Sequence, residues 1–216
     1  EPVPPPSGAA PMPLSVVVPV YNEEEVLPEL LRRVVAVLDG LPGGPREVVL
    51  VDDGSTDGSC DLMDRAAAGD PRICLVELSR NFGHQAALTA ALEHATGNLV
   101  AIVDADLQDP PEAIPGMIAR MADGHDVVFA RRVGRKEGLL LRTAYHAFYR
   151  LAAGLSTPRL PVDAGDFAVL SRRVVDELKR LPERHRYLRG LRTWVGFRQL
   201  GVDVERGHRV AGSSKY

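Results

Sequence analysis

The sequence has 216 residues, of which 45% are hydrophobic and 25% are charged, values typical of a soluble globular protein with one sizeable domain. The formal net charge of −3 excludes a bulk electrostatic attraction to nucleic acid or to an anionic membrane. Cys60 and Cys74 lack CxxC spacing and indicate reduced thiols, and without a run of about eighteen apolar residues we expect no membrane-spanning helix in this chain.

The first residues differ in composition from the rest of the chain. Residues 1–13 are rich in proline and have neither a basic start nor an apolar core, so we expect a poorly ordered leader and not a signal peptide. The folded domain is expected over residues 14–216. It opens with the β-branched run LSVVVPV at 14–20, which predicts a buried parallel strand.

Helix and strand patterns then alternate along the chain. Asn22 is predicted to cap a helix with Glu25 as its capping-box partner, because apolar residues recur at helical spacing from Leu27 to Leu38. The next patterns predict strands at 47–53, 73–78, 99–104 and 126–130, and helices through Met63, at 84–95 and at 112–121. Beyond Arg131 the alternation loosens into a helix at 139–155, a short strand at 166–170 and a helix at 172–181. This order is typical of an α/β fold with a mostly parallel sheet, which binds ligands at the carboxyl ends of its strands.

Acidic side chains follow the fourth predicted strand, in the segment DADLQD. Because alternate residues of an extended segment face the same side, Asp104 and Asp106 are expected to converge, with Gln108 continuing the row. Oxygen ligands with room for water and phosphate suit Mg²⁺ or Mn²⁺. The alternative is that these acids only form a turn and cap the next helix. Their position after an apolar strand, with Pro110 and Pro111 at the exit, favours the metal site.

A second polar segment, VDDGSTDGS, closes the second predicted strand. One interpretation is a strand-to-helix turn, in which Gly54 permits an unusual backbone conformation and Asp57 favours the helix start. The other is a nucleotide site, in which Asp53 or Asp52 accepts hydrogen bonds from a base or ribose, and the residues alone leave both open. The sequence contains neither GxxxxGK[ST] nor GxGxxG, so a P-loop or a dinucleotide-binding fold lacks support.

Six segments, in this order, resemble a known family. VVVPVYNEEEVL, VDDGSTDGS and DADLQDPPE look like the family 2 glycosyltransferases, which have the GT-A fold. SRNFGHQAALTAALEHATGN, VDAGDFAVLSRRVVDEL and LPERHRYLRGLRTWVGF narrow the resemblance to polyprenyl-phosphate glycosyltransferases of the bactoprenol glucosyltransferase type, relatives of dolichol-phosphate mannose synthase. The resemblance extends over residues 14–216 and implies a Rossmann-like, mostly parallel sheet flanked by helices.

The resemblance also implies roles for individual residues. The residues that would bind the nucleotide sugar are Pro19, Tyr21, Glu23, Asp53 and Asp104. Those that would hold Mg²⁺ or Mn²⁺ on the donor diphosphate are Asp104, Asp106 and Gln108. Those that would act at the reacting centre are Asp106, Asp166 and Arg131. Those that would bind the acceptor phosphate are Arg131, Arg135, Arg209 and Lys215.

The implied reaction is an inverting transfer of glucose from UDP-glucose to undecaprenyl phosphate, at the cytoplasmic face of the cell membrane. A homo-oligomer is compatible with the family, and no nucleic-acid partner is expected. Family members continue past the SKY motif into membrane helices, whereas this sequence ends at Tyr216, so we expect those segments to be missing from it; Ser213 also replaces an acidic residue of that motif. The alternatives are a mannose synthase that uses GDP-mannose, a processive polysaccharide synthase, a nucleotidyltransferase and a non-catalytic sugar-nucleotide-binding domain. The stretch GLRTW lacks the Gln of the QxxRW motif, which argues against the polysaccharide synthase.

Three further features have two interpretations each. The basic stretch RRVGRK is expected to be mostly a solvated face, with one or two of Arg131, Arg132 and Arg135 in contact with phosphate. His84 follows NFG at a predicted helix start, where it either marks an anion site or caps and packs the helix. Aromatic side chains of the later helical stretches, Trp194 among them, are expected in the core, with a membrane-facing surface as the alternative.

Overall fold

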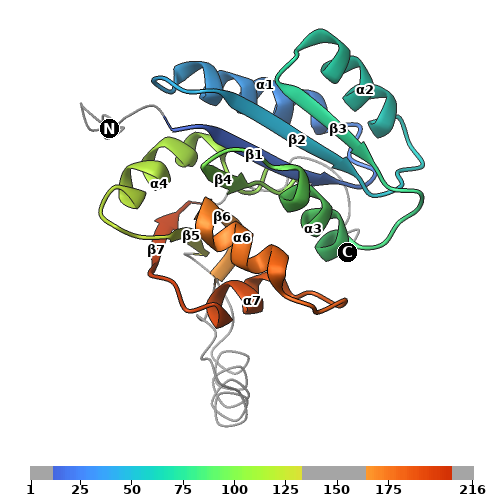
Figure 1. Cartoon of the computed structure of the whole chain (residues 1–216). Helices are drawn as coiled ribbons and strands as arrows, with labels where there is room; N and C mark the ends of the chain where they lie inside the picture. Colours follow the sequence, from blue (N-terminus) through green and yellow to red (C-terminus); the bar gives the residue numbers. More distant parts are fainter. Residues whose placement is uncertain (1–11, 133–163, 206–216) are drawn as a thin grey trace, which may run out of the picture.

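A seven-stranded β-sheet runs through the part of the chain that the computed structural model describes, residues 12–132 and 164–205 (Figure 1). Its strands are β1 (Leu14–Val20), β2 (Arg46–Asp52), β3 (Ile73–Glu77), β4 (Leu99–Ile102), β5 (Val127–Arg132), β6 (Ala164–Ser171) and β7 (Gln199–Val204). They lie side by side in the order β3-β2-β1-β4-β6-β5-β7. Chain order therefore reverses between β1 and β4, which is where open α/β sheets place their ligands.

Strand directions confirm the predicted, mostly parallel sheet. Strands β1 to β4 run parallel to one another, and β7 runs parallel to β5. Strand β6 is antiparallel to both of its neighbours, β4 and β5. As a result, the start of β6 reaches the same sheet edge as the carboxyl ends of the other strands, so residues from the last third of the chain meet the loops that follow β1, β2 and β4.

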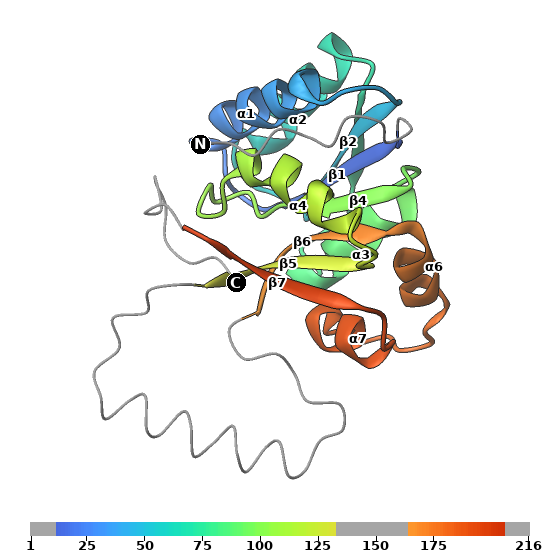
Figure 2. The same cartoon turned by 90° about the vertical axis from the view of Figure 1, so that its left-hand side faces the viewer.

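Helices cover both faces of the sheet (Figures 1 and 2). Their bounds are α1 (Leu27–Gly40), α2 (Ser59–Gly69), α3 (His84–His94), the 3₁₀ turn η1 (Pro111–Ala113), α4 (Ile114–Met121), α6 (Arg172–Arg180) and α7 (Leu188–Trp194). Helices α1, α2 and α4 enclose one apolar cluster with one face of the sheet, and α3, α6 and α7 enclose another with the opposite face. Because both faces are covered, all seven residues of β1 are buried, as the unbroken run LSVVVPV predicted. Within these described residues no helix combines the length and the apolar character that crossing a membrane requires.

The structure confirms the predicted elements before Arg131 and corrects one of their ends. Asn22 does not cap α1, which starts at Leu27 after Val26 and has no side-chain cap. Asn22 has a positive φ of 53°, and its Oδ1 accepts hydrogen bonds from the backbone amides of Thr56, at 2.7 Å, and Asp57, at 3.3 Å. The capping prediction was wrong because the Asn22 side chain instead forms hydrogen bonds that connect the loop after β1 to the loop after β2.

Later elements depart further from the prediction. The strand predicted at 166–170 is longer and central, because β6 pairs with β4 on one side and β5 on the other. The sequence did not predict α7 or β7, since both are short and their apolar residues alternate weakly with polar ones. The predicted leader up to residue 11 and the predicted helix at 139–155 lie outside the described residues.

Backbone packing at Gly54 holds two site loops together. Gly54 has a φ of +70°, a conformation that side chains other than glycine rarely adopt. A Cβ atom at this position would lie 2.5 Å from the carbonyl carbon of Arg80 and 2.6 Å from the amide nitrogen of Asn81. The loop after β2 therefore touches the loop after β3 at a point where only hydrogen fits.

We expect Gly54→Ala to lower the free energy of unfolding by about 2–4 kcal/mol, because it adds backbone strain to a clash with a neighbouring loop. Urea denaturation measures this value. The matched control is Gly116→Ala in α4, where a Cβ meets nothing within 4 Å. The control should be neutral or stabilising by up to about 1 kcal/mol. Equal stability of both variants would contradict the close approach.

Candidate active site

Partly exposed polar side chains alternate with buried apolar ones along the segment after β4. Asp104, Asp106 and Gln108 are partly exposed, whereas Ala105 and Leu107 between them are buried. The row is held locally, because the backbone amide of Gln108 donates to Oδ1 of Asp106 at 3.0 Å. The structure thus agrees with the predicted alternation of side chains along DADLQD.

Three elements bring charged groups together around Asp104. Nε2 of His84, the first residue of α3, lies 3.6 Å from Oδ1 of Asp104 and 3.9 Å from Oδ2 of Asp166, near the start of β6. His84 therefore packs between the two carboxylates that the sequence predicted for the site.

The Asp104 carboxylate is incompletely compensated. Its Oδ1 atom is buried and accepts no hydrogen bond in the structure. Burial raises the pKa of Asp104 to about 6; His84 opposes the shift, and the nearby Asp166 and Asp106 add to it. An unpartnered carboxylate oxygen beside other acids is a position that a cation would stabilise.

The residues fit a metal ion when a ligand supplies part of its coordination. Among residues 12–132 and 164–205, no group of three His, Cys, Asp or Glu side chains is arranged around one point as a metal site. Asp104 and Asp106 supply carboxylate oxygens two residues apart in one segment, and Gln108 follows them; all three side chains are partly exposed. Such a donor set suits a hard cation that is shared with phosphate oxygens and water.

The second carboxylate, Asp166, is fully paired. Arg189 of α7 donates to both of its oxygens, at 2.7 Å from one guanidinium nitrogen and 3.2 Å from another. Burial alone would raise the pKa of Asp166, but the hydrogen bonds and charge of Arg189 outweigh it and hold this pKa below the ordinary value. The site therefore contains two carboxylates whose pKa values are driven in opposite directions, an arrangement typical of groups with different roles.

A second arginine of α7 lies behind this ion pair. Arg192 is 2% exposed, and one of its terminal nitrogens lies 3.4 Å from the carbonyl oxygen of Gly165. Its guanidinium stacks on the Phe129 ring at 5.0 Å, and burial lowers the pKa of Arg192 to about 10. Neither Arg189 nor Arg192 was predicted as a site residue. Their spacing of three residues could have indicated two cations on neighbouring turns of one helix.

Asp53, predicted to bind the nucleotide, holds a neighbouring loop in the structure. Asp53 is completely buried, and its two oxygens accept hydrogen bonds from the backbone amides of Phe82, at 2.8 Å, and Gly83, at 3.0 Å. These bonds position the loop that leads into α3, and the nucleotide contact of Asp53 stays a prediction. Its neighbour Asp52 is 4% exposed and accepts a hydrogen bond from the backbone amide of Ser55 at 3.2 Å.

The other residues predicted for the nucleotide lie at the end of β1. Pro19 is buried within the strand and pairs with Val51 of β2. Tyr21 is partly exposed and Glu23 is 7% exposed, in the loop that the Ser55 and Ser59 hydroxyls hold through backbone hydrogen bonds. The loop that carries Tyr21 and Glu23 therefore adjoins the loop after β2, and their contact with the nucleotide stays a prediction.

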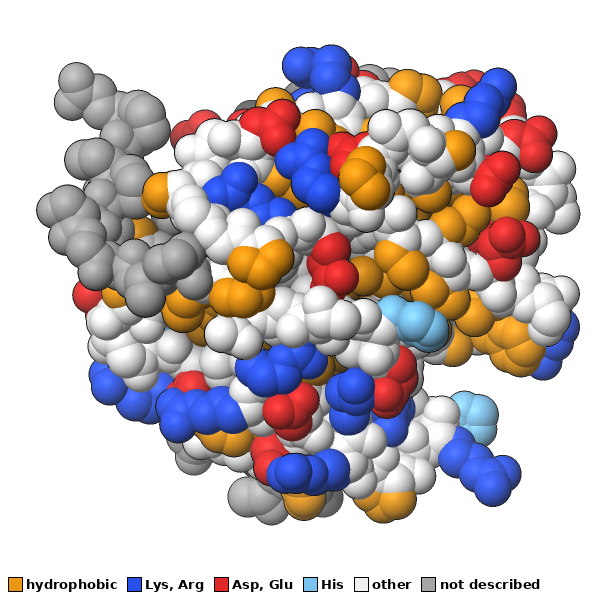
Figure 3. Space-filling view, turned by 45° about the horizontal axis from the view of Figure 1, so that its top comes forward, with side chains coloured by type: hydrophobic (Ala, Val, Ile, Leu, Met, Phe, Trp, Pro, Cys, Tyr) orange, Lys and Arg blue, Asp and Glu red, His pale blue; other side chains and the backbone are white. Residues whose placement is uncertain are grey.

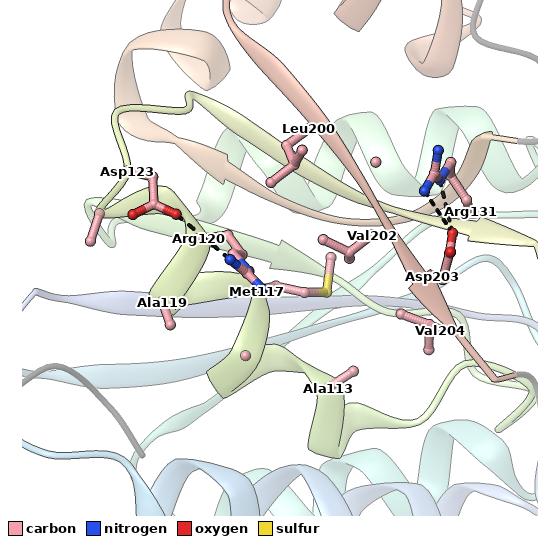
Figure 4. A pocket seen from close by; sticks show the side chains of 13 residues that line it. Ala113, Met117, Ala119, Arg120, Asp123, Arg131, Leu200, Val202, Asp203 and Val204 are labelled. Atoms are coloured by element: carbon pink, nitrogen blue, oxygen red, sulfur yellow. Dashed lines mark hydrogen bonds and ion pairs between the residues drawn. The ribbon is translucent and has the colours of Figure 1, made fainter. Parts of the chain in front are cut away.

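Arg131 pairs with a carboxylate outside the candidate site. It ends β5 beside an apolar groove of about 820 Å³ between α4 and β7, and it forms an ion pair with Asp203 at 2.9 Å (Figure 4). Its charge is therefore paired with β7, and none of its described contacts is with Asp104 or Asp166. The other residues predicted to bind the acceptor phosphate, Arg135, Arg209 and Lys215, lie outside the described residues.

The raised pKa of Asp104 predicts a cost to stability. In the folded state the pKa of Asp104 is about 6, whereas an ordinary Asp carboxyl has a pKa of 3.8. Ionisation of Asp104 therefore destabilises the fold progressively between these two pKa values, and the full cost persists above about pH 6. With EDTA present, Asp104→Asn should raise the free energy of unfolding by about 1–3 kcal/mol at pH 8 and by little near pH 4.

Thermal unfolding at both pH values measures this difference. Asp123→Asn is the matched control, because it removes an exposed carboxylate near the end of α4. An Asp104→Asn variant that is less stable than the wild type at pH 8 would contradict the predicted strain.

Comparison with known proteins gives the site a family context. The sequence pattern of glycosyl transferase family 2 matches residues 15–179. An uncharacterized glycosyltransferase, YkcC of Bacillus subtilis, is 44% identical over 94% of this chain and 62% of its own length. The bactoprenol glucosyl transferase of Shigella phage SfX is 40% identical over 95% of this chain and 67% of its own. An undecaprenyl-phosphate 4-deoxy-4-formamido-L-arabinose transferase of Salmonella paratyphi A is 38% identical over 94% and 62%. The chain thus spans about two thirds or less of these relatives.

Solved structures share the fold. The mannosyltransferase PcManGT of Pyrobaculum calidifontis, solved with GDP-Man and Mn²⁺, has a TM-score of 0.68 and 25% identity over 94% of this chain and 58% of its own. The match to the family pattern covers residues 15–179, a range that includes Asp53, Asp104 and Asp166. The chain belongs to glycosyl transferase family 2.

Proposed function

We propose that the chain transfers glucose from UDP-glucose to a polyprenyl phosphate such as undecaprenyl phosphate, at the cytoplasmic face of a membrane. The observation that carries the proposal is the meeting of Asp104, whose Oδ1 has no hydrogen-bond partner, with Asp166, which Arg189 holds ionised. The names of the bactoprenol glucosyl transferase and of the undecaprenyl-phosphate transferase among its relatives support this substrate class.

On the donor side, Asp104 and Asp106 would hold a divalent ion, with Gln108 as a third candidate ligand. Mn²⁺ in the mannosyltransferase complex supports a divalent ion, and oxygen ligands suit Mg²⁺ equally. When bound, the ion supplies positive charge that stabilises the leaving nucleoside diphosphate. The two carboxylates keep that charge at the carboxyl end of β4, at the point where chain order in the sheet reverses.

On the acceptor side, the reaction needs no strong base. A phosphate monoester is anionic near neutral pH, so its oxygen can attack the anomeric carbon directly. The new bond joins this oxygen to the anomeric carbon, while the bond from that carbon to the diphosphate oxygen breaks and UDP leaves. A single displacement inverts the configuration. Asp166, kept ionised by Arg189, stabilises positive character on the sugar or orients the acceptor.

The donor is tested with a panel of sugar nucleotides. With undecaprenyl phosphate and Mg²⁺ or Mn²⁺, we expect turnover to be highest with UDP-glucose and to be abolished by EDTA. A preference for GDP-mannose, the donor named for PcManGT, would instead assign a mannose transfer. Binding of every donor without any transfer would indicate a non-catalytic sugar-nucleotide-binding domain.

Removal of one ligand charge tests the donor site. Asp106→Asn should lower transfer by about 100-fold or more and abolish the metal dependence of UDP binding in calorimetry, because one carboxylate next to the diphosphate is lost. Circular dichroism should show an unchanged fold. Asp123→Asn serves again as the control with full activity, and wild-type turnover by Asp106→Asn would overturn the assignment.

Arg189 is expected to matter for turnover but not for donor binding. Arg189→Ala frees Asp166 from its bidentate partner, so kcat should fall by about 100-fold while UDP affinity stays the same. The pKa of Asp166 should rise, which moves the acid limb of the pH–rate profile to higher pH.

Arg189→Lys keeps the positive charge but cannot donate to both oxygens of Asp166 in the geometry of a guanidinium group, so it should restore part of the rate. Arg32→Ala, at an exposed site on α1, is the control. A loss of UDP affinity that equals the loss of kcat would contradict this positioning role.

A further inference from the structure

The stretch that contains α7 is basic in a chain that is acidic overall. Residues 182–198 read PERHRYLRGLRTWVGFR and hold five arginines and one acidic residue, Glu183. The whole chain carries a net charge of −3. Figure 3 shows several Arg and Lys side chains along the lower part of the molecule, the part where α6 and α7 lie in Figure 1. The basic charge of this sequence is therefore concentrated locally.

Two large aromatic side chains on this stretch are left in solvent. Tyr187 is 49% exposed and Trp194 is 58% exposed, the latter against the expectation that Trp194 belongs to the core. Leu188 and Arg192 form the buried side of α7. Tyr187 directly precedes α7 and Trp194 is its last residue, so one exposed ring stands at each end of the helix.

Exposed cations flank the two aromatic residues. Arg184 and Arg198 are exposed at the two ends of the stretch, and neither forms an ion pair with a described residue. Arg186 donates to the backbone carbonyls of Glu183, at 3.1 Å, and Leu181, at 2.8 Å, which fixes the loop before α7. We call Arg184, Tyr187, Trp194 and Arg198 the α7 surface.

The α7 surface begins next to the candidate reacting centre. Tyr187 directly precedes α7, and Arg189, two residues later, binds Asp166. A solvated basic face is the ordinary explanation for arginines, but it does not account for two exposed aromatic side chains at the two ends of one short helix. Aromatic rings with a polar group, together with arginines, are the side chains that lie at the headgroup level of a bilayer.

We propose that the α7 surface docks on an anionic lipid bilayer, with Trp194 and Tyr187 among the headgroups and Arg184 and Arg198 on the lipid phosphates. The proposal rests on the proposed function, because an acceptor phosphate embedded in a bilayer has to reach a site that faces it. The docking itself requires no donor, metal or acceptor, so it is measured separately from transfer. Because Arg189 of α7 binds Asp166, docking would also place Asp166 close to the membrane surface.

The sequence contains a single tryptophan, so its fluorescence reports on Trp194 alone. The experiment adds vesicles of phosphatidylcholine, with or without phosphatidylglycerol, to the full chain. With the anionic vesicles we expect a blue shift of the emission, quenching by brominated lipids, and a loss of both at high salt. Vesicles of phosphatidylcholine alone should produce little change. An unchanged emission, or an equal response to both vesicle types, would overturn the proposal.

Charge reversal provides the matched comparison. Arg184→Glu with Arg198→Glu should weaken vesicle binding by about tenfold or more, since each cation near an anionic surface contributes to the attraction. Arg32→Glu with Arg120→Glu makes the same change of charge at exposed sites on α1 and α4 and should leave binding nearly unchanged. Equal losses in both pairs would indicate a response to net charge alone and would overturn the assignment to α7.

Failure of docking and failure of the proposed function give different results. Calorimetry with UDP-glucose and Mn²⁺, and transfer to a short water-soluble prenyl phosphate, require no membrane. If both succeed while anionic vesicles leave the Trp194 emission unchanged, the docking proposal is wrong and the proposed function is unaffected. Concentration-dependent self-association that buries Trp194 without lipid would also overturn the docking, because it would assign the surface to a second copy of the chain.

Discussion

The arrangement of the site depends on carboxylates that are kept partly out of water. Asp104 has a buried oxygen without a hydrogen-bond partner, and Asp166, close to the same His84 ring, is neutralised by Arg189. Two acids this close would repel each other if both were ionised and unpaired. The fold separates their roles by giving one of them an arginine and leaving the other to attract a cation. Function is thus obtained at the expense of stability around Asp104.

Hydrogen bonds between the loops next to the site hold this arrangement in place. Asp53 binds two backbone amides of the loop before α3, so it sets where His84 enters the site. Asn22 binds two amides of the loop after β2, and Gly54 lets that loop touch the loop after β3. Polar side chains that look like caps or ligands in the sequence can therefore hold loops together, as Asn22 and Asp53 do.

The sequence predicted the parallel half of the sheet well, because β1 to β4 have unbroken apolar runs and polar residues directly after them. It also predicted the side-chain alternation of Asp104, Asp106 and Gln108, which follows from local geometry. It misassigned Asn22, because a capping pattern does not reveal a partner in a distant loop. It overlooked Arg189, because only the antiparallel pairing of β6 brings α7 to Asp166, and such long-range pairing has no local signal.

The central position of β6 has a consequence for the order of assembly. Strands β1 to β4 come from the first half of the chain and can pair as soon as they are synthesised, but β4 then presents an unpaired apolar edge. That edge is covered only when β6 arrives from the last third of the chain and pairs with it. Until then the nascent protein carries an exposed strand edge of the kind that recruits other chains. The same late event brings Asp166 to Asp104, so a molecule that has escaped misassembly is also one whose active site is complete.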